Sequence, residues 1–165
     1  MTPQARTAVQ DHYPDDVAHC YGCGRLNAHG LHVRSVRDGD AMVARFTPRA
    51  EHIAVPGYVY GGLIASLIDC HAIGTAAAAA ERAEGREIGE APAPRFVTGS
   101  LHVDFLAPTP LGPELELRAE VTSASARKAL VAVAVSVGGR VTARGEVVAV
   151  RMPASMARME TPPAP

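Results

Sequence analysis

The hydrophobic positions follow two different periods along the chain. A period of two residues predicts a hairpin, and a helical period further on predicts a long helix. Residues 31–46 predict a β-hairpin, because apolar and polar positions alternate on both sides of an Asp38-Gly39 turn. From Gly61 to about Arg82 the apolar positions follow a helical period. This helix is apolar around nearly its whole circumference, so most of its surface must be buried.

Strand patterns follow the helix. Residues 114–121 alternate cleanly, and residues 129–137 are continuously apolar, which indicates a strand covered on both faces. With residues 96–106 and 141–150 they complete a set of four strands. A curved antiparallel sheet wrapped around one buried helix, the α+β hotdog architecture, accounts for this order. An open α+β sandwich with the helix on one face is the alternative.

The length of 165 residues fits a single domain with short flanking segments. We expect an irregular N-terminal lid segment over residues 1–30, a hotdog domain over residues 31–151, and a flexible Pro-rich tail over residues 152–165. Aromatic residues make up only 4% of the chain, so the core must be aliphatic. A run of alanines in the helix would let the sheet approach closely.

Charge and cysteine content exclude several classes of protein. A formal net charge of −1 disfavours nucleic-acid binding, which needs a basic surplus. Three cysteines disfavour a disulfide framework. The first thirty residues show no apolar h-region, so we expect no secretory signal peptide. The apolar helix is long enough to span a membrane, but Asp69 and His71 lie at its centre. We therefore expect a cytoplasmic protein without a membrane span.

Several motifs resemble one known family. The segment Tyr60-Gly61-Gly62 is followed by Asp69, nine residues after Tyr60. This spacing resembles the signature of hotdog acyl-CoA thioesterases of the phenylacetate-pathway type, and Cys20-Tyr-Gly-Cys-Gly, residues 52–57 and residues 98–108 resemble other motifs of that family. The resemblance implies an acyl-CoA substrate, a catalytic Asp69, and a homodimer or a dimer of dimers. The family's usual His before the glycines is Tyr60 here, and the Gln or Asn of some relatives falls on Ala54.

The residue types of this signature suit thioester hydrolysis. A helix that begins at Gly61 presents unpaired N–H groups, which could stabilise an oxyanion, while Gly62 supports the geometry. Alternatively, both glycines only permit a tight turn. Asp69 is costly to bury without a partner, and it could act as general base or as nucleophile. A purely structural Asp69, hydrogen-bonded to the backbone or to His71, is the alternative.

The spacing of the two groups predicts an oligomer. Asp69 lies eight residues beyond Gly61, which is about 12 Å along a helix axis. One helix cannot bring both groups to one carbonyl, but two antiparallel helices related by a two-fold axis can. If Gly61 and Asp69 act together, each active site combines residues of two chains.

Other residues are candidates for supporting roles. Thr98 could orient Asp69 or hold the attacking water, and Ser100 is its substitute because alternation would place it on the same strand face. His52 and Tyr60 could line the substrate site. At the start of a later strand, Arg127 and Lys128 could meet the phosphates of coenzyme A, as could Arg140 or Arg144.

The cysteines give weaker signals. Cys70 follows Asp69, but adjacent helical residues point about 100° apart, which disfavours Cys70 as nucleophile. The pair Cys20 and Cys23, together with His19 and His29, could bind zinc, although one C-x-x-C pair is a weak signal. We interpret it as a small-residue turn and expect no metal, and no cofactor apart from the coenzyme A of the substrate.

These observations predict an acyl-CoA thioesterase that hydrolyses a small or medium acyl- or aryl-CoA. A non-catalytic acyl-CoA sensor on the same fold is one alternative; it would retain the pocket but lack the acid. A hotdog enoyl-CoA hydratase or dehydratase is another, which the missing His at position 60 disfavours.

Overall fold

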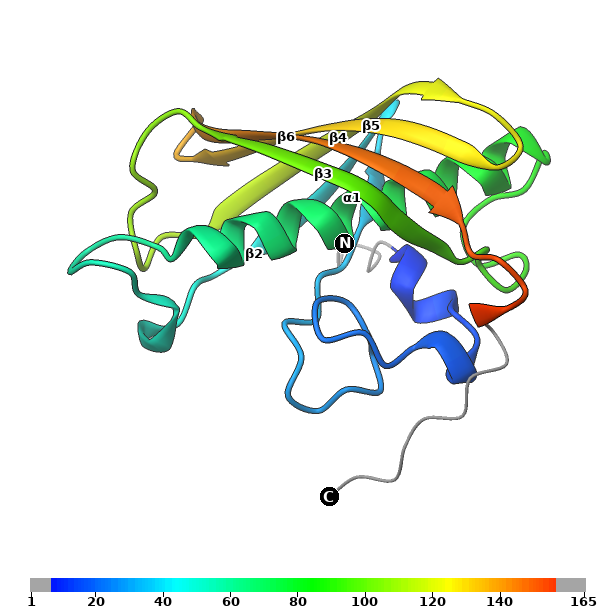
Figure 1. Cartoon of the computed structure of the whole chain (residues 1–165), viewed down its shortest axis with the longest axis horizontal. Coiled ribbons are helices and arrows are strands. Elements are labelled where there is room, and N and C mark those ends of the chain that lie inside the picture. Colours follow the sequence, from blue (N-terminus) through cyan, green and yellow to red (C-terminus); the bar gives the residue numbers. More distant parts are fainter. Residues whose placement is uncertain (1–6, 157–165) are drawn as a thin grey trace, which may run out of the picture.

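One long helix lies across the concave face of a six-stranded antiparallel sheet (Figure 1). The computed structural model describes residues 7–156. The strand order is β1-β2-β4-β5-β6-β3, which leaves β1 and β3 at the edges. The strands are β1 (Val36–Asp38), β2 (Ala41–Phe46), β3 (Phe96–Phe105), β4 (Leu115–Ala124), β5 (Lys128–Val137) and β6 (Arg140–Arg151). The predicted hotdog architecture is confirmed, and the open sandwich is wrong.

The helix α1 (Gly61–Ala83) sits close to the sheet where Ile68 meets Gly145 of β6. At Gly145 of β6 an added Cβ would lie 2.3 Å from Cγ2 of Ile68, so only glycine allows this approach. Leu67, Ile68 and Ala77 are fully buried. The helix is long and apolar enough to cross a membrane, but 72% of its apolar window is buried inside the protein, as in the core helix of a globular domain.

The N-terminal segment packs against the side of α1 that the sheet leaves open (Figure 1). It contains two short 3₁₀ helices, η1 (Val9–His12) and η2 (Asp15–Val17). Val9 and Tyr13 are buried in the same core cluster as the apolar residues of α1. This part of the expected lid segment is therefore part of the core. Residues 1–6, and residues 157–165 of the expected tail, lie outside the described residues.

A buried polar network joins this segment to the helix. Ser35 Oγ donates to Nδ1 of His71 at 2.8 Å, and His71 Nε2 donates to the Met42 carbonyl at 3.1 Å. Gln10 Nε2 donates to Ser35 Oγ, and the Ser35 N–H donates to Gln10 Oε1. Burial lowers the pKa of His71 to about 4, so the ring is neutral and serves as both donor and acceptor.

The hairpin is shorter than the alternation predicts. Leu31 and Val33 are buried as expected, but the first strand begins only at Val36. The Leu31 N–H donates to the Tyr21 carbonyl and the Val33 N–H to the Gly22 carbonyl, so this backbone pairs with the N-terminal loop instead of with β2. The predicted strand over residues 31–35 is therefore wrong. The helix and the four later strands agree with prediction to within a few residues.

Near the end of α1, Glu81 gives a pH-dependent prediction. Its side chain is buried, and neither carboxylate oxygen has a hydrogen-bond partner among the described residues. Burial raises its pKa, against the opposing charges of Arg86 and Arg37. We expect Glu81→Gln to increase the free energy of unfolding at pH 8 by on the order of 1 kcal/mol, because a poorly solvated charge is removed.

The sign of the effect follows from the raised pKa. The folded protein binds the Glu81 proton more tightly than the unfolded chain does. The free energy of unfolding of the wild type therefore approaches that of Glu81→Gln as the pH falls through the raised pKa towards the ordinary Glu value. Urea unfolding of both proteins between pH 8 and pH 4.5 measures this difference. A gap that stays constant with pH would show that ionisation of Glu81 is not its cause.

Candidate active site

Asp69 stands out as a half-buried carboxylate on an otherwise apolar stretch of α1. Its Oδ1 accepts a hydrogen bond from Thr98 Oγ1 of β3, the neighbouring edge strand. Burial raises the pKa of Asp69, the bond from Thr98 opposes this, and nearby Cys20 adds to the increase. Asp69 is thus a fixed, poorly hydrated carboxylate, which makes it a better proton acceptor than an exposed one.

The hydroxyl of Thr98 reaches Asp69 because β3 is irregular at this point. The register with β6 shifts between Thr98 and Ser100, which pair with the consecutive residues Ala149 and Val148. Consecutive strand residues point to opposite faces, so Ser100 faces away from Thr98. The expectation that Ser100 shares the face of Thr98 is wrong, because the bulge at Gly99 reverses the alternation.

The N-terminus of α1 presents free backbone donors beside a shallow groove. No side chain caps the helix, and among the described residues no hydrogen bond engages the N–H of Gly61 or Gly62. A groove of about 290 Å³ adjoins Gly61, and its lining includes Phe105 and Pro108. Such a helix end suits a carbonyl oxygen that acquires negative charge.

The Tyr60 side chain lies against the second glycine of the signature, Gly62. A Cβ at Gly62 would lie 2.1 Å from the Tyr60 hydroxyl oxygen, so the Tyr60 ring folds back over Gly62. The ring remains 56% exposed beside the helix start. Tyr60 is therefore placed to contact whatever binds at this end of the helix.

Three other candidates make no hydrogen bond with Asp69 among the described residues: His52, Arg127 and Lys128. His52 is buried, its Nδ1 accepts the Arg49 N–H at 3.0 Å, and its ring packs against Phe46. These contacts hold the loop before α1, and burial lowers the pKa of His52. Arg127 and Lys128 lie at the end of the sheet near Thr98, but Lys128 points to the face opposite α1, since the next residue, Ala129, is buried.

The alternative partners of Asp69 are engaged elsewhere. His71 belongs to the Ser35 network described above, so the suggested hydrogen bond between Asp69 and His71 is absent from the described residues. Cys70 turns towards the N-terminal segment, where its Sγ lies 3.8 Å from Cys20 Sγ. Neither residue provides a catalytic group next to Asp69.

A cluster of three free cysteines is the main feature that sequence reasoning missed. The ligand atoms of Cys20, Cys23 and Cys70 all lie within 4.8 Å of one another. Hydrogen bonds from the Cys23 and Cys70 thiols lower the pKa of Cys20, with help from the Cys23 and Gly22 N–H groups. The hydrogen bond with Cys20 raises the pKa of Cys23 to about 12 and is the first cause of the increase at Cys70.

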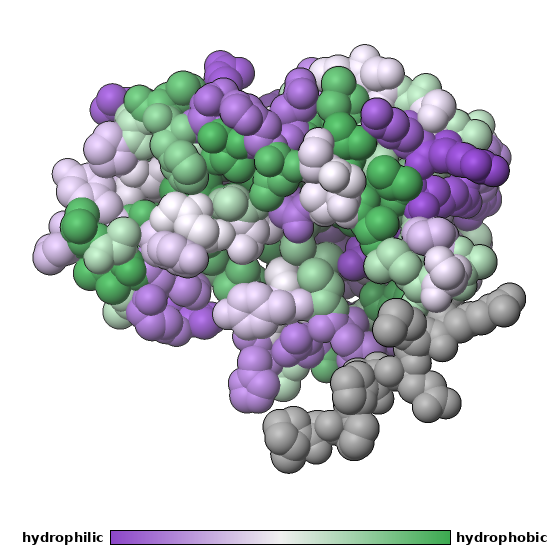
Figure 2. Space-filling view, in the orientation of Figure 1, coloured by the Kyte–Doolittle hydropathy of each residue, from purple (hydrophilic) through white to green (hydrophobic). Residues whose placement is uncertain are grey.

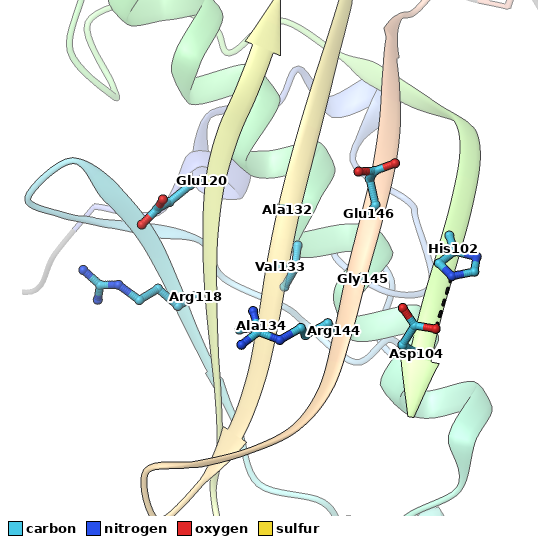
Figure 3. A pocket seen from close by; sticks show the side chains of 10 residues that line it. All are labelled: His102, Asp104, Arg118, Glu120, Ala132, Val133, Ala134, Arg144, Gly145 and Glu146. Atoms are coloured by element: carbon cyan, nitrogen blue, oxygen red, sulfur yellow. Dashed lines mark hydrogen bonds and ion pairs between the residues drawn. The ribbon is translucent and has the colours of Figure 1, made fainter. Parts of the chain in front are cut away.

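Another groove lies on the outer face of the sheet, away from Asp69. It measures about 400 Å³, and Ala132 and Ala134 form part of its lining. Figure 3 shows polar and charged side chains along it, with α1 behind the strands; they are His102, Asp104, Arg118, Glu120, Arg144 and Glu146. Neither Asp69 nor Thr98 lines this groove.

A curved antiparallel sheet around one long helix defines this chain as a hotdog-fold protein. The sequence profile of the thioesterase superfamily matches residues 56–144. A thioesterase superfamily protein from Shewanella loihica, of known crystal structure, is 46% identical, and the match covers 77% of this chain and 96% of that one with a TM-score of 0.63. The chain belongs to the thioesterase superfamily.

More distant structures share the fold. The Escherichia coli PaaI protein from the phenylacetic acid degradation operon is 17% identical, with a TM-score of 0.60 over 74% of this chain and 81% of that one. A Streptococcus mutans protein bound to acetyl-CoA is 14% identical, with a TM-score of 0.56 over 73% of this chain and 88% of that one. A search of curated proteins gave no match. The resemblance to hotdog thioesterases is confirmed.

Proposed function

We propose that the protein hydrolyses a small or medium acyl- or aryl-CoA thioester to the free acid and coenzyme A. The observation that carries the proposal is the half-buried Asp69 carboxylate, held by the Thr98 hydroxyl on an otherwise apolar helix. A carboxylate whose pKa is raised by partial burial is typical of a functional site. A cytoplasmic location belongs to the proposal, since three free thiols lie side by side.

The groups present can carry out both halves of the reaction. With Asp69 as general base, a water oxygen attacks the thioester carbonyl and its proton passes to the carboxylate. The carbonyl oxygen becomes an oxyanion that the Gly61 N–H stabilises. The C–S bond then breaks, the proton passes to the departing thiolate, and free acid and coenzyme A leave. With Asp69 as nucleophile, the carboxylate attacks the carbonyl, the C–S bond breaks and the coenzyme A thiolate leaves a mixed anhydride; water then hydrolyses the anhydride to the free acid, restores the Asp69 carboxylate and supplies the proton of the thiol.

The Asp69 carboxylate and the Gly61 N–H can act on the same carbonyl only if two chains contribute to one site. Asp69 of α1 contacts Thr98 near the start of β3. Gly61, at the start of α1, lies beside Phe105 at the end of β3, where a Cβ added to Gly61 would be 3.3 Å from the Phe105 ring. If two β3 edge strands pair antiparallel about a two-fold axis between these positions, the Asp69 end of one chain meets the Gly61 end of the other. The dimer and its composite sites are therefore part of the proposal.

The surface around β3 supports such pairing. β3 pairs with β6 on one side, and its other side has no partner among the described residues. Leu101 and Phe105 are 39% and 56% exposed, which is unusual for large apolar side chains on an edge strand. Figure 2, in the orientation of Figure 1, shows hydrophobic side chains exposed among hydrophilic ones on the face that is turned towards the viewer.

Recognition of coenzyme A would use the basic residues beyond the reacting centre. Arg127 and Lys128 remain our candidates for the phosphates, since they lie at the same end of the sheet as Thr98. The acetyl-CoA complex of the Streptococcus mutans protein shows that this fold can hold a CoA thioester. Tyr60 and the groove at Gly61 would then shape the acyl end.

Steady-state assays on the untagged protein with a panel of acyl- and aryl-CoA esters test the proposal. Loss of thioester absorbance is the appropriate signal, because the three free cysteines would react with a thiol reagent. We expect hydrolysis of at least one ester with kcat/KM in the range typical of enzymes, about 10⁴ M⁻¹s⁻¹ or above. Ester binding without any hydrolysis would instead identify a sensor, and hydration of an enoyl-CoA would identify a hydratase.

Thr98 provides a second test, on the positioning of the carboxylate. We expect Thr98→Val to lower kcat by about 10- to 100-fold with KM little changed, because the freed Asp69 no longer points at the carbonyl. Thr98→Ser keeps the hydroxyl, so its kcat should stay near that of the wild type. Equal losses of kcat in both variants would show that the side-chain shape, and not the hydrogen bond, matters.

A further inference from the structure

Three cysteines from two distant parts of the chain meet beside the proposed catalytic residue. Cys20 and Cys23 lie in the N-terminal loop, and Cys70 follows Asp69 on α1. Their sulfur atoms lie within 4.8 Å of one another, and no other His, Cys, Asp or Glu ligand atom among residues 7–156 joins the group. Cys23 and Cys70 are buried, while Cys20 is partly exposed. One side of the cluster therefore faces solvent.

The loop around the first two cysteines has the geometry of a metal-binding turn. The Gly24 N–H donates to the Cys20 carbonyl at 2.7 Å, and the N–H groups of Gly22 and Cys23 point at the Cys20 sulfur. A Cβ at Gly22 would lie 2.2 Å from Cys70 Sγ, and one at Gly24 would lie 2.4 Å from the Cys20 nitrogen. Both glycines are thus needed for the loop to close on itself and on Cys70.

The spacing of the sulfur atoms fits one tetrahedral metal ion. Zinc binds thiolates at about 2.3 Å, which places two sulfurs of a tetrahedron about 3.8 Å apart. Cys20 Sγ and Cys70 Sγ are 3.8 Å apart. A disulfide would require about 2.05 Å and would leave the third sulfur without a role. Sulfur ligands select zinc over harder cations.

A partly buried cation, the Arg95 guanidinium, compensates for the charge of such a site. Three thiolates and one divalent cation carry a net charge of −1. The guanidinium of Arg95 lies over the Tyr13 ring, 4.7 Å from its centroid, and interacts electrostatically with all three cysteines. A complex of zinc with three thiolates would therefore be close to neutral together with Arg95.

We propose that Cys20, Cys23 and Cys70 bind one zinc ion, whose fourth ligand is a water molecule on the exposed side of Cys20. The ion would tie the N-terminal loop to α1 one residue from Asp69 and so fix the wall of the site at that point. The sequence suggested His19 and His29 as partners of the C-x-x-C pair, but both are exposed and neither belongs to the cluster. Cys70 takes their place.

Metal analysis of untagged protein, purified in reducing, chelator-free buffer, tests this proposal without reference to activity. We expect about one zinc per chain in the wild type. Cys20→Ser and Cys70→Ser should each retain less than about one tenth of it. His19→Ala, next to Cys20 in sequence, is the matched control and should keep its full zinc content.

Cobalt substitution keeps the test decisive if the serine variants fail to fold. Wild-type protein stripped of metal under reductant should take up one equivalent of Co²⁺ and develop thiolate-to-cobalt charge transfer together with intense tetrahedral visible bands. Protein without zinc that also shows no cobalt spectrum would overturn the proposal. So would full zinc content in Cys70→Ser, or a disulfide within the cluster in protein isolated under reductant.

Discussion

Replacing Asp69 with Asn should reduce kcat/KM for thioester hydrolysis by about 10³-fold or more, because the site loses its base or nucleophile. The change is nearly isosteric, and the Asn carbonyl oxygen can still accept the Thr98 hydrogen bond. It also removes a carboxylate whose burial raises its pKa, so stability should not fall. Kinetic assays beside thermal unfolding and CoA-ester binding measure the three effects separately.

Asp104→Asn is the matched control for that experiment. Asp104 lies on the same edge strand as Thr98, but its side chain is exposed and pairs with His102 at 3.3 Å on the outer groove. It should hydrolyse thioesters at the wild-type rate. A wild-type rate in Asp69→Asn would remove Asp69 from the mechanism, whereas equal losses in both variants would point to a general effect of acidic charge.

Much of the fold could be predicted because its patterns depend on burial alone. The apolar helix beginning at Gly61 has the helical period over some twenty residues, and only enclosure by a sheet can cover it. The clean alternation in β4 likewise identified a strand with one buried face. The segment 31–35 shows the same alternation without being a strand, because its backbone pairs with a loop that has no pattern of its own.

The site could be predicted only where local geometry decided it. Asp69 and Thr98 were identified from the cost of burying a carboxylate and from the motif around each residue, and the structure brings them together. Ser100 was misplaced because alternation assumes a regular strand, although an isolated glycine such as Gly99 is a known sign of a bulge. Cys70 joined the cysteine cluster through tertiary contacts, which spacing along the chain does not reveal.

Mixing two inactive variants should restore activity if each site combines two chains. Gly61→Pro removes one N–H at the first helical position, where proline is tolerated, and Tyr60 has the extended conformation (φ −61°, ψ 128°) that a residue before proline adopts. Loss of an oxyanion donor should lower kcat by about 10²- to 10³-fold. Gly61→Ala carries the same added Cβ beside Phe105 but keeps the N–H, so it should retain activity.

The recovered rate identifies the architecture of the site. A composite site is intact only when its Asp69 comes from a Gly61→Pro chain and its helix start from an Asp69→Asn chain. Random assembly of equal amounts makes each condition true half of the time, so about one quarter of the wild-type rate should return in a dimer or in a dimer of dimers. If Gly61 and Asp69 acted within one chain, no mixture could contain an intact site, and refolded or co-expressed mixtures would stay as inactive as their components.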